Sequence, residues 1–271
     1  MPDWLIVIIL GVIEGITEFL PISSTGHLLI AGHWLKEQSD LFNVVIQSGA
    51  VIAVIPLFSD RCRKLLFDWR KAENRSYLLK LTAAFCVTGA GGLILEKNNF
   101  QLPETVRPVA WALIIGGFLF VAVETWISKR PKIDEITWTV AIIVGLGQLI
   151  AAVFPGASRS GTTILLALVL GVSRSAATEF SFLVGIPTML AAGSLKIAKT
   201  LLRPPPNQDS ESWGLLILGT LVSAVVSFVV VKWLLKFIQT HTFKGFGWYR
   251  IILGGLILLL ATQLNLNSPP E

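Results

Sequence analysis

The chain has 271 residues, of which 53% are hydrophobic and 14% charged, and its mean hydropathy is +0.71. This composition excludes an ordinary soluble globular domain and indicates a polytopic membrane protein. The net charge is +5, but Lys and Arg lie mostly in loops between apolar runs. The charge therefore indicates membrane topology rather than nucleic-acid binding.

Six apolar runs are long enough to cross about 30 Å of hydrocarbon as helices. In chain order they cover about 41–58, 76–95, 108–127, 178–198, 213–238 and 246–265. Two further apolar stretches lead into polar motifs, and each is followed by a short second apolar helix; these pairs are about 4–20 with 24–35 and about 137–154 with 158–171. We therefore predict an all-α membrane protein with six transmembrane helices and two re-entrant helical hairpins.

Other features of the chain are expected to carry no chemistry. The first apolar run lacks a positively charged start and a cleavage site, so we expect it to be retained rather than removed as a signal peptide. Cys62 and Cys86 show neither disulfide nor metal spacing. The Pro-rich segment 201–213 is expected to be an external loop.

The two polar motifs are copies of one pattern, EGITEFLPISSTGH at 14–27 and QLIAAVFPGASRSG at 148–161. Pro21 aligns with Pro155, and Ser24 aligns with Ser158. Each proline interrupts the incoming helix, and the serines that follow are suited to cap a new one.

An odd number of spans, three, separates the two expected hairpins, so the second should enter from the opposite face. This predicts an inverted-topology repeat in a single membrane domain, with repeat one at about 1–127 and repeat two at about 134–267. Most basic residues follow the spans that end near 58, 127 and 238, with Arg250 counted in the last of these loops. The positive-inside bias then places both termini and the opening of the first hairpin outside the cell.

Glu14 and Glu18 are four residues apart in an apolar helix, so both carboxylates lie on one helix face. Two buried carboxylates require a cation, a proton or an arginine to offset their charge. We expect them to bind a divalent cation, Mg²⁺ or Ca²⁺, because these ions prefer oxygen ligands. Acid–base chemistry and a purely structural pair are the alternatives. Gln148 stands at the Glu14 position of the second motif, so the acidic half belongs to the first.

His27 follows Ser24 by three residues, which places both on one side of a short helix. The imidazole is suited to accept a phosphoryl group, to activate Ser24 or to protonate a leaving oxygen. Ser23 and Thr25 flank Ser24 and are expected to contact phosphate.

PGASRSGTT at 155–163 is typical of an anion site, because it combines Arg159 with hydroxyls and a helix start. An arginine at membrane depth costs about 3 kcal/mol on insertion scales, so we expect Arg159 to lie beside Glu18. Further phosphate contacts are expected from Gly156, Ser158, Ser160 and Thr163.

Two charged residues outside this motif are interpreted separately. Arg174 either contacts a distal phosphate or pairs with Glu179 at the membrane interface. Glu124, near the end of an apolar span, is interpreted as an interfacial acid beside Trp126.

E-x-x-x-E followed by FLPISSTGH, with a later PGxSRSxxT, resembles the undecaprenyl-diphosphate phosphatases of the bacitracin-resistance type, over essentially the whole chain. The resemblance implies hydrolysis of this lipid diphosphate to the monophosphate and inorganic phosphate in the bacterial inner membrane, as part of cell-wall synthesis. It also implies dependence on a divalent cation, and bacitracin resistance, since bacitracin sequesters the diphosphate. The implied catalytic residues are Glu18, Ser24, His27 and Arg159.

Two alternative functions remain from the sequence. A polyprenyl-phosphate transporter or flippase is the first, because inverted repeats with broken helices are a transporter architecture. A lipid phosphatase with two histidines and an aspartate is disfavoured, because only His33 and His241 accompany His27. The nucleophile is left open between Ser24, His27 and water, and so is a homodimer.

Overall fold

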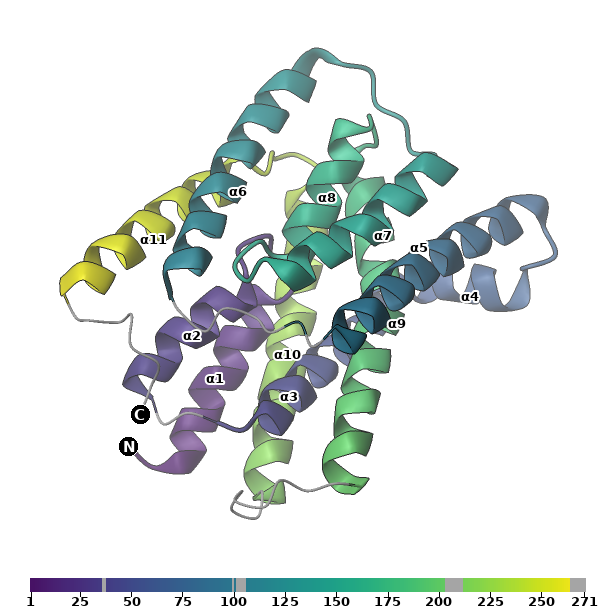
Figure 1. Ribbon diagram of the computed structural model, residues 1–271. Helices are drawn as coiled ribbons and strands as arrows, with labels where there is room; N and C mark the ends of the chain where they lie inside the picture. The colour runs from purple at the N-terminus through teal and green to yellow at the C-terminus, as the bar shows by residue number, and fades with distance from the viewer. Residues whose placement is uncertain (36–37, 99, 101–105, 203–211, 264–271) are drawn as a thin grey trace.

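The protein, seen in a computed structural model, is described over residues 1–35, 38–98, 100, 106–202 and 212–263 (Figure 1). These residues form helices and no strand, and one isolated bridge joins Ile133 to Val172. Lys36, Arg203 and most of the Pro-rich segment fall outside the described residues. The helices are α1 (Asp3–Thr17), α2 (Ser24–Trp34), α3 (Asp40–Val54), η1 (Ile55–Phe58), α4 (Ser59–Phe67), α5 (Ala72–Lys97), α6 (Val106–Trp126), η2 (Ile127–Lys129), α7 (Trp138–Val153), α8 (Arg159–Val169), α9 (Arg174–Leu202), α10 (Trp213–Phe237) and α11 (Lys244–Gln263).

Six helical segments of the described chain are long and apolar enough to cross a membrane, which confirms the predicted number of spans. They are Leu41–Phe67, Ala72–Lys97, Val106–Lys129, Arg174–Thr200, Trp213–Phe237 and Lys244–Ala261. The first includes α4, so the loop expected after residue 58 begins instead as a charged helix. Asp60 lies in the first turn of α4, where a negative charge stabilises a helix.

The four helices of the polar motifs are shorter than these spans. α1 has 15 residues and α7 has 16, so at 1.5 Å per residue each is about 22–24 Å long. A hydrocarbon layer of about 30 Å is thicker than that. The short partner helices α2 and α8 have 11 residues each. Both helix pairs lie where hairpins were predicted.

The first helix of each motif pair packs against a helix from the other half of the chain. α1 packs along α10, and α7 packs along α5, while α6 and α11 lie side by side. Glycines allow both crossed contacts: a Cβ at Gly11 would lie 2.7 Å from the Gly219 carbonyl oxygen, and one at Gly145 would lie 2.8 Å from that of Ala84. The two halves are therefore interleaved rather than separate modules.

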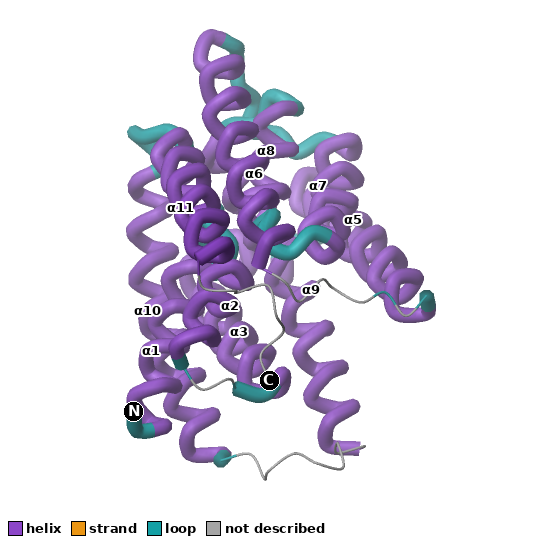
Figure 2. Tube along the Cα trace, turned by 60° about the vertical axis from the view of Figure 1, so that its left-hand side comes forward, coloured by secondary structure: helices purple, strands orange, loops and turns teal. Residues whose placement is uncertain are grey.

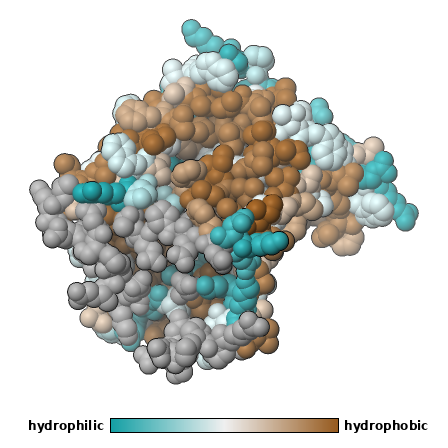
Figure 3. Space-filling view, in the orientation of Figure 1, coloured by the Kyte–Doolittle hydropathy of each residue, from teal (hydrophilic) through white to brown (hydrophobic). Residues whose placement is uncertain are grey.

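The outer surface of the protein carries many large apolar side chains. Figure 3 shows a broad hydrophobic surface over the helices, with hydrophilic side chains at the top and right of the view and beside the grey residues. Large aliphatic side chains such as Ile115, Val225 and Leu259 are more than half exposed. Such a surface is stable only in lipid, so the protein is a multi-pass membrane protein.

The turns that follow α1 and α7 lie next to each other near the centre of the molecule (Figure 1). In Figure 2 α1 and α2 lie below this point, whereas α7 and α8 lie above it. The Ser160 hydroxyl donates to the Leu20 carbonyl oxygen at 3.2 Å, which joins the two turns directly. The expected meeting of the two motifs is confirmed.

Candidate active site

The repeated motif folds into the same local structure twice. Ser23 and Ser158 precede α2 and α8 with positive φ angles of 74° and 68°. Each side chain accepts a hydrogen bond from a backbone N–H three residues ahead, Gly26 N at 3.3 Å and Gly161 N at 3.1 Å. A positive φ is strained for a residue other than glycine and is tolerated where surrounding structure enforces it. Both turns are thus held in a conformation that the chain would not adopt alone.

Glu18 is the point at which the two motifs meet. Its Oε1 accepts from Arg159 Nη2 at 3.1 Å, and its Oε2 accepts from Ser24 Oγ at 2.7 Å and from Gln47 Nε2 at 3.2 Å. The Glu18 and Arg159 side chains are only 4% and 15% exposed. This confirms the predicted contact between the acid of the first motif and the arginine of the second.

Several charged atoms in this cluster have unused hydrogen-bonding capacity. Among the described residues, both carboxylate oxygens of Glu14 are buried without a hydrogen bond, and so are Nε and Nη1 of Arg159. Buried polar groups in native proteins normally have partners. The unused donors of Arg159 fit an anion, and the unused acceptors of Glu14 fit a cation.

The hydroxyls of the second motif are tied into the protein. Ser158 and Ser160 lie 3.2 Å apart through their Oγ atoms, and the Thr163 hydroxyl donates to the Arg159 carbonyl oxygen at 2.7 Å. Thr163 also contacts the Ser181 hydroxyl. Gly156 has a φ of 92°, a conformation that favours glycine. Their expected phosphate contacts stay predictions, as does that of Thr25, which is exposed.

His27 points toward α11 rather than toward Glu18. Its Nδ1 lies 2.7 Å from the Ser23 carbonyl oxygen, and its Nε2 lies 2.7 Å from the Tyr249 hydroxyl. Because a carbonyl oxygen only accepts, Nδ1 carries a proton in this arrangement. In the neutral ring Nε2 then accepts from the Tyr249 hydroxyl.

The pairing with Glu179 that was one alternative for Arg174, and the interfacial position expected for Glu124, are wrong. Arg174 pairs with Glu124, with Nε at 2.8 Å from Oε1, whereas Glu179 pairs with Arg61 at 2.6 Å. Glu124 is completely buried and also accepts from Phe243 N at 2.9 Å, so it is not an interfacial acid.

Arg174 is also remote from the Glu18 cluster. Arg159 begins α8, and Arg174 begins the next helix beyond its far end. Eleven residues of helix span about 16 Å. The structure therefore does not bring Arg174 to the site.

Three residues of the cluster were missed from the sequence. Gln47 is a polar residue in the mostly apolar helix that begins FNVVIQSG, and Tyr249 and Arg250 lie in the span GFGWYRIIL. Arg250 is 1% exposed and lies inside α11, so counting it as a loop residue was wrong. A polar residue in the middle of an apolar run is the signal that was available.

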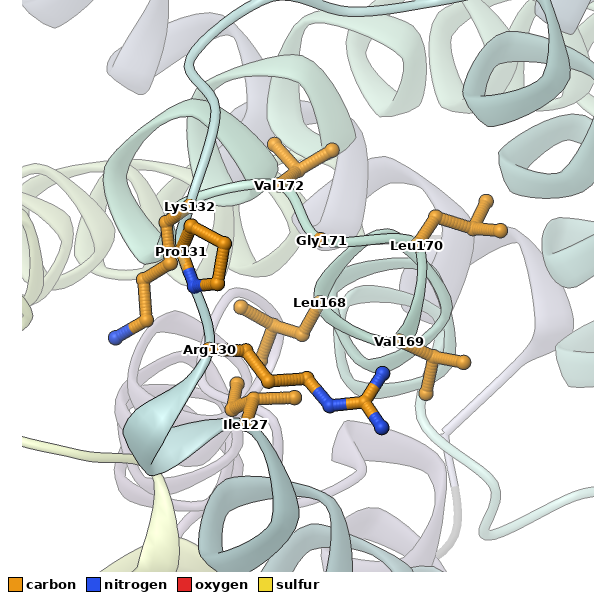
Figure 4. Close-up of a pocket in the computed structure, with 9 residues that line it drawn as sticks. All are labelled: Ile127, Arg130, Pro131, Lys132, Leu168, Val169, Leu170, Gly171 and Val172. Carbon is orange, nitrogen blue, oxygen red and sulfur yellow. The ribbon is translucent and has the colours of Figure 1, made fainter.

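A cavity of about 280 Å³ lies elsewhere, between the α6–α7 connection and the end of α8 (Figure 4). Its lining includes Ile127, Arg130, Lys132 and residues 168–172. Arg159 is at the opposite end of α8. This cavity is thus separate from the Glu18 cluster.

Six apolar helices surrounding a buried acid–arginine cluster define a polytopic membrane protein with an internal polar site. Residues 7–256 match the family described as bacitracin resistance protein BacA, and the chain belongs to this family. A protein from Rhizobium etli is 52% identical over 257 residues, covering 94% of this chain and 96% of its own length. One from Xylella fastidiosa is 49% identical over 256 residues, covering 94% and 97%. Both are named undecaprenyl-diphosphatase.

Proposed function

We propose that this protein hydrolyses undecaprenyl diphosphate to undecaprenyl phosphate and inorganic phosphate. The observation that carries this function is the buried contact of Glu18 with Arg159 and Ser24, in a chain about half identical to proteins named for this reaction. The hydrolysis recycles the lipid carrier of cell-wall synthesis. It gives bacitracin resistance by removing the diphosphate that bacitracin binds. The names of these relatives favour a phosphatase over a transporter.

Arg159 is the proposed phosphate clamp. Its buried Nε and Nη1 are without partners among the described residues, so the guanidinium group still has N–H donors for phosphate oxygens. Arg159 also begins α8, where backbone N–H groups favour an anion. Together they would stabilise negative charge on the transferred phosphoryl group, which is the main requirement in such reactions.

Ser24 is the proposed nucleophile, because its hydroxyl already donates to Glu18 at 2.7 Å. Its oxygen would attack the distal phosphorus while its proton passes to Glu18. The bond from that phosphorus to the bridging oxygen breaks, and undecaprenyl phosphate leaves. Water then hydrolyses the phosphoserine and releases inorganic phosphate. His27, one helical turn from Ser24, is the proposed proton donor to the leaving oxygen; for this step its ring must carry a second proton, on the Nε2 that in the neutral form accepts from the Tyr249 hydroxyl.

Glu14 and Glu18 are the proposed ligands of a divalent cation, Mg²⁺ or Ca²⁺. The fit rests on the two unpaired carboxylate oxygens of Glu14. No group of three or more His, Cys, Asp or Glu among the described residues forms a closed metal site. Mg²⁺ is commonly held by one or two carboxylates together with substrate phosphates. Such an ion would neutralise charge on the phosphate oxygens.

The function is tested by phosphate release from farnesyl diphosphate, a short polyprenyl diphosphate, with purified protein. The Arg159→Ala variant is expected to lose nearly all release, whereas Arg130→Ala, an exposed arginine stacked on Trp126, should retain it. A transporter would release no phosphate in any variant. That result would exclude the proposed hydrolysis.

The nucleophile and the cation are tested separately. Rapid quenching should trap phosphate on wild-type protein and none on Ser24→Ala; phosphate mapped to His27, or no trapped phosphate, contradicts the Ser24 assignment. Chelation should abolish release, and Mg²⁺ or Ca²⁺ should restore it in wild type but poorly in Glu14→Gln. Full release after chelation would exclude a required cation.

The two motif regions are proposed to be re-entrant hairpins of an inverted repeat in the bacterial inner membrane, with both termini and the site opening outside. The crossed packing of α1 on α10 and of α7 on α5 supports this arrangement. The prenyl tail would leave sideways into lipid while the diphosphate lies between the two turns. A homodimer stays a prediction, for which light scattering of the detergent-solubilised protein is the measurement.

A further inference from the structure

Arg250 is the most completely buried basic residue among those described, with 1% of its surface exposed. All five N–H donors of its guanidinium group meet backbone carbonyl oxygens. Nη1 lies 3.2 Å from Pro21 O and 3.0 Å from Ala157 O. Nη2 lies 3.1 Å from Gly156 O and 3.1 Å from Ala112 O, and Nε lies 3.4 Å from Leu113 O.

These carbonyl groups belong to three separate parts of the protein. Pro21 lies in the turn after α1, Gly156 and Ala157 lie in the turn after α7, and the other two carbonyls belong to α6. Gly116 leaves room for the guanidinium group on α6, since a Cβ there would lie 2.2 Å from Nη2. A single side chain of α11 thus connects both motif turns to one rigid helix.

Arg250 differs from the other buried arginines in the groups that surround its charge. Arg159 pairs with Glu18, and Arg174 pairs with Glu124. No ion pair of the described residues joins Arg250 to an acid. Its charge is offset by carbonyl dipoles alone, so its role is not to neutralise a carboxylate.

The carbonyls that Arg250 holds are close in sequence to the reacting groups. Pro21 is three residues after Glu18, and Ala157 is two residues before Arg159. A trans peptide directs its C=O and the following N–H in opposite directions. Holding the Ala157 carbonyl therefore also fixes the direction of the Ser158 N–H at the start of α8.

We propose that Arg250 is a positioning residue that sets the spacing of the two motif turns, and thereby the placement of Glu18 and Ser24 relative to Arg159. This inference rests on the proposed function. Lysine at this position would keep the charge but has three donors on one atom instead of five on a planar fork. It would leave at least two carbonyls without a partner, and the turns would separate.

The kinetic test compares Arg250→Lys with Arg174→Lys, a matched change at a buried arginine outside the site. A misplacement of about 1 Å costs on the order of 100-fold in rate, so kcat for phosphate release from farnesyl diphosphate should fall by about that factor in Arg250→Lys. KM should change less than kcat, and Arg174→Lys should keep kcat. Unchanged kcat in Arg250→Lys, alongside active wild type and inactive Arg159→Ala, overturns this inference and leaves the proposed function standing.

A distance measurement separates positioning from a general loss of structure. Spin labels at Ile16→Cys and Phe154→Cys, two exposed sites beside the turns, would be measured after Cys62 and Cys86 are replaced by Ser. The distance distribution should shift or broaden in Arg250→Lys and stay as in wild type in Arg174→Lys. A fall in kcat with an unchanged distribution overturns the positioning role.

If Arg250→Lys does not fold, a second variant tests the contact of the Arg250 guanidinium group with α6. Gly116→Ala places a methyl group against Nη2 and should displace the guanidinium group while Arg250 itself remains. Gly255→Ala, in α11 with nothing within 4 Å of the added Cβ, is the control. Equal kcat and equal label distances in these two variants overturn the proposal.

Discussion

At the residue scale, the polar groups of the site form two sets of contacts, one around Glu18 and one around His27. Gln47 and Ser24 donate to one oxygen of Glu18, and Arg159 donates to the other. His27 is held between the Ser23 carbonyl oxygen and the Tyr249 hydroxyl. Buried hydrogen-bond networks fix the geometry of their members. Small changes in this network should therefore alter the rate more than the stability.

The contact between Tyr249 and His27 gives the first such prediction. Tyr249→Phe removes only the hydroxyl that meets His27 Nε2. A hydrogen bond contributes about 1 kcal/mol, so kcat for phosphate release should fall about fivefold at unchanged thermal stability.

Tyr77→Phe is the matched control, because Tyr77 is the other tyrosine of the chain and its hydroxyl contacts Glu179, remote from His27. Its kcat should remain that of wild type. Equal rates in the two variants would show that the Tyr249 hydroxyl does not act on His27.

Gln47 gives a second prediction at this scale. Gln47→Leu keeps similar volume but removes the amide that donates to Glu18 Oε2 at 3.2 Å. The orientation of the carboxylate beside Ser24 then depends on fewer contacts, and kcat should fall severalfold. Gln239→Leu, after the end of α10, is the control. A rate for Gln47→Leu equal to that of this control would remove Gln47 from the site.

At the element scale, ion pairs and close helix contacts hold the spans together. The Glu124–Arg174 pair joins α6 to the start of α9, and Glu124 also accepts from the backbone of Phe243 before α11. Glu124→Gln leaves a buried arginine without its counter-charge, which typically costs about 3–5 kcal/mol. Thermal unfolding in detergent should show a loss of that order.

The control for this pair is Lys71→Gln, which removes the exposed Lys71–Asp68 pair at 3.3 Å. Exposed pairs contribute about 0–1 kcal/mol, so its unfolding midpoint should hardly move. Similar midpoints for the two variants would mean that the buried pair contributes no net stability.

The contact between α7 and α5 predicts that alanine has opposite effects on stability at two glycines. Alanine favours a helix over glycine by up to about 1 kcal/mol, so Gly92→Ala, with nothing near the added Cβ, should keep or raise stability. Gly145→Ala should lower it by about 1–3 kcal/mol, because the Cβ would lie 2.8 Å from the Ala84 carbonyl oxygen. Unfolding midpoints that rise in both variants would contradict the close contact.

The elements differ in how far they follow from the sequence. The six spans were predictable, because a helix in hydrocarbon must be apolar along its length. The Glu18–Arg159 contact was predictable as well, since two copies of one motif with opposite charges need each other. The packing of α11 against the site was not predictable, because a contact with a helix so distant in the sequence leaves no pattern of residues in the motif. For the same reason Glu124, 50 residues away, was not foreseen as the partner of Arg174.

At the scale of the whole molecule, the helix pairs of the two motifs lie on different sides of one central point, as Figures 1 and 2 show. Glu14 lies in the last turn of α1 and Glu18 directly after this helix, whereas Arg159 begins α8, directly after the turn that follows α7. An enzyme acting on a lipid diphosphate must admit a charged headgroup from one side of the membrane while its tail stays in lipid. The exposed Thr25, at the start of α2, marks the side from which that headgroup would enter.

Thiol accessibility tests this orientation. With Cys62 and Cys86 replaced by Ser, Thr25→Cys should react with a membrane-impermeant maleimide in intact cells, because the first hairpin is proposed to open outward. Arg130→Cys, exposed between α6 and α7, should react only after the membrane is disrupted, because the basic loops are proposed to face the cytoplasm. The reverse pattern would place the site opening on the cytoplasmic side, and the enzyme would then act on diphosphate of the inner leaflet.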